Sequence, residues 1–403
     1  MQIAYKVELK LNKTQKQQID SYIGVSRWAY NKFLEINSKN YQETHDPKSY
    51  MSAYTFSTWF NNQYLKDNPS DLWIKEYYSK HVKQAMIDAD TNMKAFFKHK
   101  RGKPKFRSLR KHQGSYYFCA NGKSQHVRYD TYQIKLPKIG FVRYKEQGYI
   151  PVGDDFRVVS GRIKERAGRY YLTVLVEQPD FSKLNLTGES IGIDLGIKDF
   201  AILNNGTVYK NLNKSTRLKR LRKRLRRLQR KESRQYQDYK QRLRENKYER
   251  RATTDFNLSE TQDKILKLNG RITNALNDYQ DKIIANVVRT KPQYIAIEDL
   301  NVSGMIKNHH LAKQVQQQKF YRFRIRLVNK CQWLGIPVHL VDRFYPSSKT
   351  CSQCGFYNEE FRNMGQKFLS VRKWTCPNCK SMLDRDINAS ENICITSKFK
   401  LAY

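Results

Sequence analysis

The chain has 403 residues, 39% of them hydrophobic and 13% aromatic, so it is long enough for two to four domains with substantial cores. Lysine and arginine number 76 against 37 acidic residues, which gives a formal net charge of +39. This excess predicts a polyanionic partner, with nucleic acid first and a ribosomal or membrane surface as the alternative. A run of about 18 apolar residues is absent, so we expect no transmembrane helix and no membrane partner.

The first half of the chain predicts a strand, a helical region and then more strands. Residues 1–11 alternate apolar and polar as a half-buried strand does, and a helical pattern runs from Thr14 to about residue 98. The basic loop "KHKRGKPKFRSLRKH" follows at 98–112, and its Lys103, Lys105 and Arg107 are candidate nucleic-acid contacts. From 115 to 178, short alternating runs separated by Gly and Pro predict a small barrel or sandwich. The aromatic residues there suit either base stacking or the filling of a core.

The most basic segment lies in the second half of the chain, after a predicted strand hairpin that begins near residue 187. Eleven of the eighteen residues from Lys214 to Lys231 are Lys or Arg, and leucines recur among them at helical spacing. A solvated face is the ordinary interpretation of such a run. Because charges of one sign repel one another, we favour contact with a nucleic-acid backbone. The candidates are Arg217, Arg220, Arg224 and Arg227.

The remaining elements predict an α/β layer. A helix is expected at 258–290, a strand at 294–300, one long helix at about 309–334, a strand in "PVHLVD", and a last helix in "INASENICITSKF".

Four of the seven cysteines are paired in Cys-x-x-Cys turns. Twenty-one residues separate the two pairs, which is typical of a structural zinc ribbon with four thiolate ligands and no open position. This pattern favours a reducing compartment, and therefore the cytoplasm, over a disulfide framework. The zinc ligands are Cys351, Cys354, Cys376 and Cys379.

Three acidic residues stand at strand ends or helix starts of the predicted α/β layer. Asp194 lies in the apolar run "IGIDLG", Glu298 ends "YIAIEDL", and Asp386 begins the last helix, where it could also be an N-cap. Carboxylates arranged in this way can hold two Mg²⁺ or Mn²⁺ ions for phosphodiester hydrolysis. Asp299 and Asp384 are alternative or supporting ligands, and Asp384 could instead be a helix cap.

Several motifs together resemble the TnpB family of transposon-encoded RNA-guided nucleases, which is related to miniature type V CRISPR effectors. They are "GIDLGIKDFA", "IAIEDLNV", "RFYPSSKTCSQCG", "WTCPNC" and "DRDINASENI", and the N-terminal half, with "GKPKFRS", is similar as well.

The resemblance implies an RNase H-like (RuvC) nuclease domain with a zinc-ribbon insertion. An oligonucleotide-binding β-barrel (wedge) with an inserted helical recognition domain would precede it. The implied boundaries are 1–11 and 113–185 for the barrel, 12–112 for the recognition domain, 186–346 and 383–403 for the nuclease domain, and 347–382 for the ribbon. Asp194, Glu298 and Asp386 would then be both the catalytic residues and the ligands of two magnesium ions.

The implied activity is cleavage of double-stranded DNA that pairs with a transposon-end-derived guide RNA beside a short motif read by the protein. A prokaryotic, nucleoid-associated, monomeric ribonucleoprotein is expected. Two alternatives stay open at this stage, namely a guide encoded by a CRISPR array and a repressor that binds DNA without cleaving it.

Overall fold

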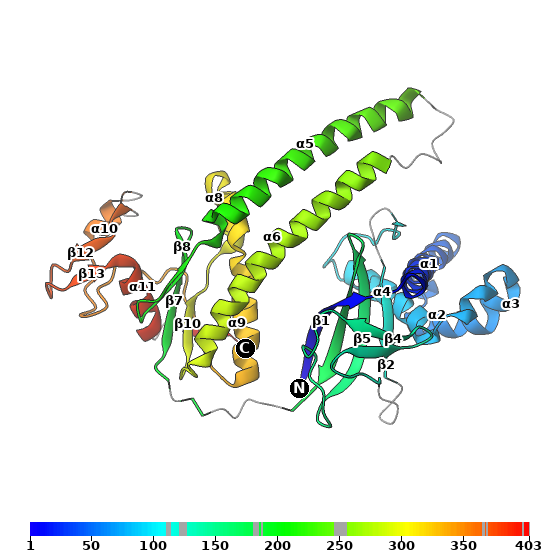
Figure 1. Cartoon of the computed structure of the whole chain (residues 1–403), viewed down its shortest axis with the longest axis horizontal. Helices are drawn as coiled ribbons and strands as arrows, with labels where there is room; N and C mark the ends of the chain where they lie inside the picture. The colour runs from blue at the N-terminus through cyan, green and yellow to red at the C-terminus, as the bar shows by residue number, and fades with distance from the viewer. Residues whose placement is uncertain are drawn as a thin grey trace. The chain divides into compact units, whose positions relative to one another are not determined.

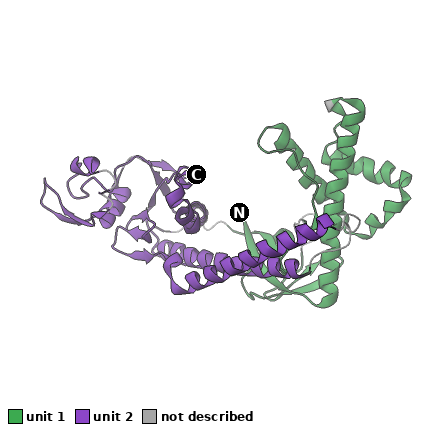
Figure 2. Ribbon diagram, turned by 90° about the horizontal axis from the view of Figure 1, so that it is seen from above, with its two compact units in different colours: residues 1–179 green, residues 180–403 purple. Residues whose placement is uncertain are grey.

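The structure is a computed structural model, and it divides into two compact units, residues 1–179 and 180–403 (Figure 2). It describes residues 1–109, 114–120, 127–179, 185–186, 188–245, 256–364, 367, 370–396 and 399–402. The domain boundaries implied by the resemblance are finer than this division and stay predictions. Among the described helices, none is both long enough and apolar enough to span a lipid bilayer.

The first unit opens with a strand and a long helix, as the sequence predicts. β1 (Gln2–Lys10) is followed by α1 (Lys13–Thr44). Asn12 caps this helix in a reciprocal pair of hydrogen bonds with Gln15. Shorter helical segments lead to α4, and their apolar side chains form one core with α1. The segments are α2 (Ala53–Trp59), η2 (Phe60–Tyr64), α3 (Leu65–Asp67), η3 (Pro69–Glu76) and α4 (Ser79–Phe97).

The strands of the first unit form one antiparallel six-stranded sheet (Figure 1). Its order is β2-β5-β6-β1-β4-β3, so the N-terminal strand lies inside a sheet made otherwise of later residues. β2 and β3 are the edge strands of this half-barrel, and closure into the full expected barrel stays a prediction. The strands are β2 (Tyr116–Cys119), β3 (Gln133–Leu136), β4 (Gly140–Tyr144), β5 (Arg157–Arg166) and β6 (Arg169–Glu177).

The second unit is built on a mixed sheet with the order β14-β11-β10-β7-β8-β9. β7, β8 and β9 are successive antiparallel neighbours, whereas β10 runs parallel to β7 and β11 parallel to β10. β14 closes the other edge, antiparallel to β11. The strands are β7 (Ile191–Leu195), β8 (Asp199–Leu203), β9 (Val208–Lys210), β10 (Ile295–Glu298), β11 (Val338–Val341) and β14 (Phe399–Leu401).

Helices cover both faces of this sheet (Figure 1). α6 (Phe256–Arg289) and α9 (Phe320–Leu334) pack on the face that carries Ile193 and Ile297. α11 (Arg385–Ile395) packs on the other face, where its Ile393 contacts Ala296. Successive side chains of a strand point to opposite faces, so the residues that alternate with the isoleucines face α11.

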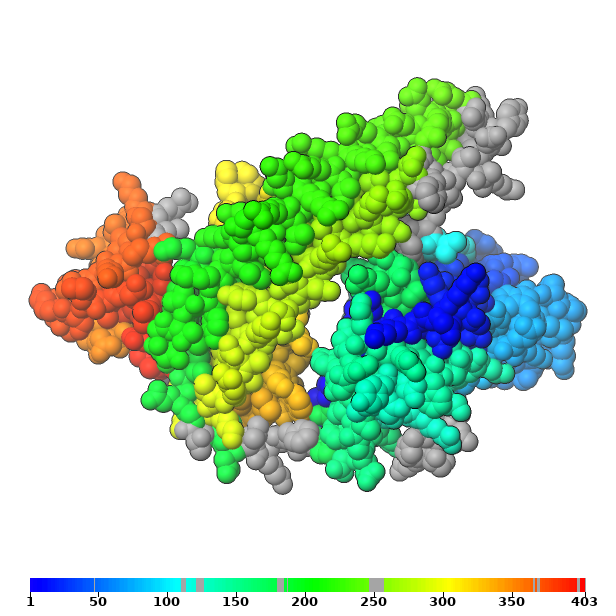
Figure 3. Space-filling view, viewed as in Figure 1, coloured from blue at the N-terminus to red at the C-terminus, as the bar shows by residue number. Residues whose placement is uncertain are grey.

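The basic segment 214–231 lies mostly in α5 (Thr216–Glu245), which packs alongside α6 (Figure 3). η5 (Leu212–Lys214) leads into it. Leu218, Leu221 and Leu225 form a small core with Ile272 and Leu276 of α6. The predicted leucine seam therefore has a structural role, because it holds the two helices together and turns the basic side chains outward.

The predicted long helix at 309–334 is wrong in one respect, because it is two helices. α7 (Val302–Lys307) and α8 (His309–Gln318) precede α9, and the chain turns at Lys319, which has a left-handed φ of 54°. The side chain of Gln280, from α6, donates to the carbonyl of Gln318 at 2.8 Å. That hydrogen bond satisfies a carbonyl that the broken helix leaves open.

A small lobe lies between β11 and α11. It contains α10 (Glu360–Asn363) and the hairpin of β12 (Lys373–Thr375) with β13 (Met382–Asp384), and its core is built on Phe361 and Trp374. Cys351 and Cys376 belong to the same core, so the lobe is organised around its cysteines.

Candidate functional site: a cysteine cluster beside three carboxylates

The four predicted cysteines come together in the small lobe. Their sulfur atoms all lie within 4.8 Å of one another, and Cys351–Cys379 and Cys354–Cys376 are each 3.7 Å apart. Zinc–sulfur bonds of about 2.3 Å in a tetrahedron place the sulfurs about 3.8 Å apart. The cluster therefore fits one zinc ion bound by four thiolates.

The backbone of the two Cys-x-x-Cys turns is the same. The residue after each pair, Gly355 or Lys380, has a left-handed φ, 74° and 63° respectively. Each donates its N–H to the carbonyl of the first cysteine of its pair at 2.9 Å. Because both turns reverse the chain in the same way, the two pairs present their sulfurs to a common point.

The cysteine lobe is tied to α11 by partly buried hydrogen bonds. The backbone N–H of Ser352, inside the first cysteine turn, donates to Asn388 at 2.8 Å, and its hydroxyl lies 2.5 Å from Glu391. Asn388 and Asn392 both donate to the carbonyl of Thr350. One face of α11 therefore fixes the lobe.

Two of the three predicted carboxylates, Asp194 and Glu298, lie on the α11 face of the sheet. They belong to neighbouring parallel strands that pair Ile193 with Ile297, so both follow the last paired residues at the same strand ends. Both are half-buried. The strand alternation that buries the isoleucines against α6 and α9 thus turns the two acids toward α11.

Gly192 lets α11 approach β7 closely, and α11 carries the third predicted acid, Asp386, toward Asp194 and Glu298. A Cβ atom at this position would lie 2.0 Å from the carbonyl oxygen of Ser390 and 2.8 Å from the Cβ of Cys394. Only glycine fits against this helix backbone. Gly192, the first glycine of "IGIDLG", therefore positions the helix that carries Asp386.

The N-terminus of α11 shows which of Asp384 and Asp386 caps the helix. Asp384 is the N-cap, because its carboxylate accepts from the backbone N–H groups of Asp386 and Ile387 at 3.0 and 3.2 Å. Asp386 lies in the first turn and is half-buried, so its carboxylate is not used as a cap.

Asp194 is the electrostatic centre of the three acids. Burial and the nearby charge of Asp386 raise the pKa of Asp194 to about 7, against a lowering contribution from Arg385. Burial and the charge of Asp194 likewise raise the pKa of Glu298 to about 7. Neighbouring, partly buried acids that repel one another are the arrangement that a divalent cation stabilises.

Arginines hold the neighbouring acids. Asp386 accepts from Arg372 at 2.9 Å and from Arg385 at 2.6 Å, and Asp299 pairs with Arg324 and Arg343. Across the described ranges, the cysteines are the one group of metal-ligating side chains gathered closely enough to share an ion as they stand. The three carboxylates are neighbours without forming such a group, and Asp386 is neutralised by arginine.

The predicted nucleic-acid contacts fall into two groups. Arg217, Arg220, Arg224 and Arg227 are all exposed on α5, and their spacing places them along one side of the helix. Lys103 and Lys105 are exposed in the loop after α4. Arg107 differs from these, because it is half-buried, lies 3.7 Å above the ring of Tyr30 and pairs with Asp88.

Sequence reasoning missed the side chains that surround these sites. Arg372 and Arg385, which hold Asp386, are two among many basic residues of the chain, although Arg385 lies inside the motif "DRD". Gly192 carried a signal, because a glycine inside an apolar strand indicates a close backbone approach.

Family profiles match three parts of the chain. A "Cas12f1-like, TNB domain" covers residues 320–393, which include all four cysteines and Asp386, and a "Probable transposase" profile covers 173–309, which include Asp194 and Glu298. A "Helix-turn-helix domain" profile covers residues 1–46. In this structure the last segment is β1 followed by one long helix.

Curated relatives align over nearly the whole chain, and each is provisionally named an RNA-guided DNA endonuclease. A protein of Streptomyces pristinaespiralis is 27% identical over 97% of this chain and 88% of its own length. InsQ of Escherichia coli K12 is 25% identical over 97% and 91%, and a Mycobacterium tuberculosis protein is 23% identical over 97% and 85%. A Cas12f1–sgRNA–target DNA complex, at 14% identity, covers 99% of both chains with a TM-score of 0.49.

Proposed function

Because the chain belongs to the TnpB (IS605 OrfB) family, we propose that it is an RNA-guided, metal-dependent DNA endonuclease. It would bind a guide RNA encoded at a transposon end, recognise a short motif beside the target, and cleave double-stranded DNA complementary to the guide. The protein would act as a monomer within its ribonucleoprotein. Its large positive charge suits this division of labour, since base pairing reads the sequence and the protein binds the backbones.

The observation that supports the proposal is that Asp194 and Glu298 follow the same ends of neighbouring parallel strands and face the helix that carries Asp386. The sheet order and strand directions of the second unit agree with an RNase H-like (RuvC) nuclease layer. The family resemblance implies that three acids of this layer form the two-metal site. Here those acids lie in β7, β10 and α11.

The carboxylate oxygens of these acids are the ligands that Mg²⁺ and Mn²⁺ prefer. When bound, two such ions would activate a water molecule and stabilise the leaving oxygen of the phosphodiester. Asp194 would be the ligand nearest to both others, because the charge of Asp386 acts on it and its own charge acts on Glu298. Asp384 fixes the helix turn from which Asp386 projects, and Asp299 is kept apart by Arg324 and Arg343.

The zinc ion bound by Cys351, Cys354, Cys376 and Cys379 would be structural. Four protein ligands leave no position for water or substrate. The lobe that these cysteines organise would lie against the target nucleic acid, as the TNB profile that covers it suggests. Its hydrogen bonds to α11 connect that lobe to Asp386.

The test is cleavage by a ribonucleoprotein purified with its own RNA. Sequencing that RNA identifies the guide, and a matched DNA duplex with Mg²⁺ or Mn²⁺ is the substrate. We expect Asp194→Ala to lower the cleavage rate at least roughly 10³-fold, because the central ligand is lost. Binding of guide and target should change little. Full cleavage by this variant would exclude Asp194 from the site.

RNA-guided binding without cleavage is the second candidate. It is favoured by one observation, namely that Asp386 pairs with two arginines. A wild-type ribonucleoprotein that binds a matched duplex tightly, yet leaves it intact with either metal, would support this candidate over the nuclease.

A further inference from the structure

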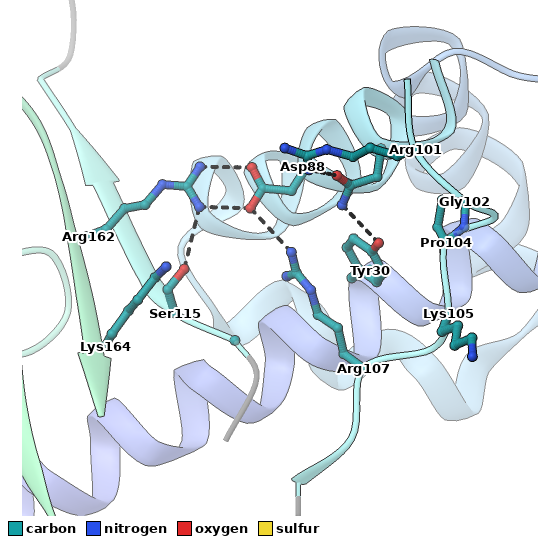
Figure 4. Close-up of a pocket in the computed structure, with 12 residues that line it drawn as sticks. Tyr30, Asp88, Arg101, Gly102, Pro104, Lys105, Arg107, Ser115, Arg162 and Lys164 are labelled. Atoms are coloured by element: carbon teal, nitrogen blue, oxygen red, sulfur yellow. Dashed lines mark hydrogen bonds and ion pairs between the residues drawn. The ribbon is translucent and has the colours of Figure 1, made fainter. Parts of the chain in front are cut away.

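A basic pocket lies in the first unit, outside the cysteine and carboxylate sites. It has a volume of about 530 Å³ and lies between the loop after α4, helices α1 and α4, and strand β5 (Figure 4). Five cationic side chains and one carboxylate line it. They are Arg101, Lys105, Arg107, Arg162, Lys164 and Asp88.

The centre of the pocket is a fixed cluster of two arginines on one acid. Arg162 binds Asp88 with both terminal nitrogens, at 2.7 and 2.8 Å. Arg107 lies 3.7 Å from the same carboxylate and stacks on the ring of Tyr30 at 3.7 Å. One carboxylate cannot neutralise two guanidinium groups, so the cluster retains a positive charge whose position is fixed by packing.

Three further cations surround this cluster and add to its charge. Among the described residues, Arg101, Lys105 and Lys164 make no ion pair with any carboxylate. Figure 4 shows Lys164 beside Ser115 on the strand side, and Arg101 and Lys105 on the loop side. Cations held together in a concave site repel one another unless an anion joins them.

The backbone around the pocket is fixed by hydrogen bonds and close packing. The loop is anchored because Arg107 exchanges two backbone hydrogen bonds with the side chain of Asn31, at 2.7 and 2.9 Å. Gly114, which also lines the pocket, has a φ of 127°, and a Cβ there would lie 2.8 Å from the carbonyl of Ile23. Arg107 and Arg162 are therefore positioned before any ligand arrives, which lowers the cost of binding.

We propose that this pocket binds a phosphate of a nucleic-acid backbone, with the Arg107–Asp88–Arg162 cluster as its floor and Lys105 and Lys164 as its rim. The identity of the ligand rests on the proposed function, since the guide RNA and the target DNA offer the same phosphodiester group. The pocket would be a fixed anchor of the first unit, distinct from the exposed arginine row on α5.

The test compares full-length wild type with K105Q/K164Q, on a labelled single-stranded RNA and a labelled DNA duplex, over a range of KCl concentrations without divalent metal. Both lysines are exposed, so the fold should be kept. Each lost phosphate contact should lower the slope of log K against log salt by roughly 0.7 on a single strand and roughly 0.9 on a duplex. Affinity at low salt should fall about tenfold.

The matched control is K66Q/K75Q, which removes the same charge from exposed lysines of the same unit that do not line the pocket. A loss on RNA alone assigns the guide, a loss on the duplex alone assigns the target, and a loss on both supports the shared chemistry. Equal losses in the control and the pocket variant would overturn the proposal. Because the probes need neither a guide match nor cleavage, this failure is separable from failure of the nuclease.

A second measurement uses the unmodified protein. Lysine acetylation followed by mass spectrometry should show Lys105 and Lys164 protected by bound RNA or DNA, while Lys66 and Lys75 stay reactive. Unprotected pocket lysines in the presence of saturating RNA and of saturating duplex would also overturn the assignment.

Discussion

The cysteine cluster and the three carboxylates are adjacent in the fold but are assembled in opposite ways. The cysteines lie in two short turns with the same backbone, so each turn fixes two ligands locally. Asp194, Glu298 and Asp386 come from three elements and meet only when β7, β10 and α11 have packed. A local site tolerates change elsewhere in the chain, whereas an assembled site depends on every contact between its elements.

α11 belongs to both regions. Its first turn carries Asp386, and the side chains of Asn388, Glu391 and Asn392 hold the cysteine lobe. Arg372, at the start of the β12–β13 hairpin, reaches back to Asp386. A disturbance of the lobe should therefore reach the carboxylates, while the reverse effect should be weaker, because the cysteine turns are complete in themselves.

Cys376→Ser should have the largest effect on stability. The free energy of binding a structural zinc ion is roughly 10–16 kcal/mol, so losing one buried ligand should leave the lobe without metal and unfolded. We expect the zinc content, measured by atomic emission on purified protein, to fall from about one ion per chain to nearly none. DNA cleavage should fall with it.

Cys119→Ser is the control, because this cysteine lies in the first unit and outside the cluster. Its zinc content should equal that of the wild type. A Cys376→Ser protein that retains zinc, or that loses zinc and still cleaves at the normal rate, would show that the lobe and the carboxylates are independent.

The same contrast explains how much the sequence could predict. The cysteine ligands follow from spacing, and Asp194 and Glu298 stand out as charged residues in or at the end of apolar strands, since both signals span a few residues. The helix break at Lys319 could not be predicted, because the hydrogen bond that stabilises it joins the Gln318 carbonyl to Gln280, thirty-eight residues away in the chain. The pairing of Arg372 with Asp386 likewise depends on how the hairpin folds back.

The choice of N-cap was open for a related reason. Asp384 and Asp386 are both good capping residues, and the sequence offered no means of separating them. The structure separates them through the β12–β13 hairpin, which ends at Asp384 and fixes where the helix begins. Local propensity allowed both registers, and the tertiary contact selected one.

Gly192→Ala tests the assembled site from the sheet side and should have an intermediate effect. The new methyl group would meet the backbone of α11, which cannot move aside without shifting Asp386. Overpacking of this kind costs about 3 kcal/mol, and the displaced acid should lower cleavage as well. Chemical denaturation and the cleavage rate measure the two effects separately.

Gly270→Ala is the matched control, because it lies within α6 with open space where its Cβ would be. It should raise the free energy of unfolding by up to about 1 kcal/mol, since alanine favours the helix. If Gly192→Ala leaves both the free energy of unfolding and the cleavage rate as high as this control does, then α11 can accept a Cβ atom at this position. The close approach would then not position Asp386.

His81, in the first unit, is a useful contrast to the carboxylates, because its pKa is strongly shifted although it belongs to no candidate functional site. Burial lowers the pKa of His81 to about 4, yet both ring nitrogens have backbone partners, at 2.9 Å to the Tyr22 carbonyl and 3.0 Å to the Tyr117 N–H. Asp194 and Glu298 differ, because the pKa of Asp194 is raised partly by the charge of Asp386, and that of Glu298 partly by the charges of Asp194 and Asp299. Repulsion between ionisable groups, rather than burial alone, therefore marks the candidate site.

His81 should accordingly affect stability and not cleavage, and its effect should be the smallest. The unfolded chain takes up a proton near pH 6.5 while the folded chain does not until about pH 4, so stability is full above pH 6.5 and is lost as the pH falls. The loss between pH 7 and pH 5 should be about 2 kcal/mol by denaturant titration. His81→Gln should remove this slope, and the exposed His310→Gln should keep it. A slope that survives in His81→Gln would mean that other groups bind the proton, and burial of His81 would then explain none of the acid sensitivity.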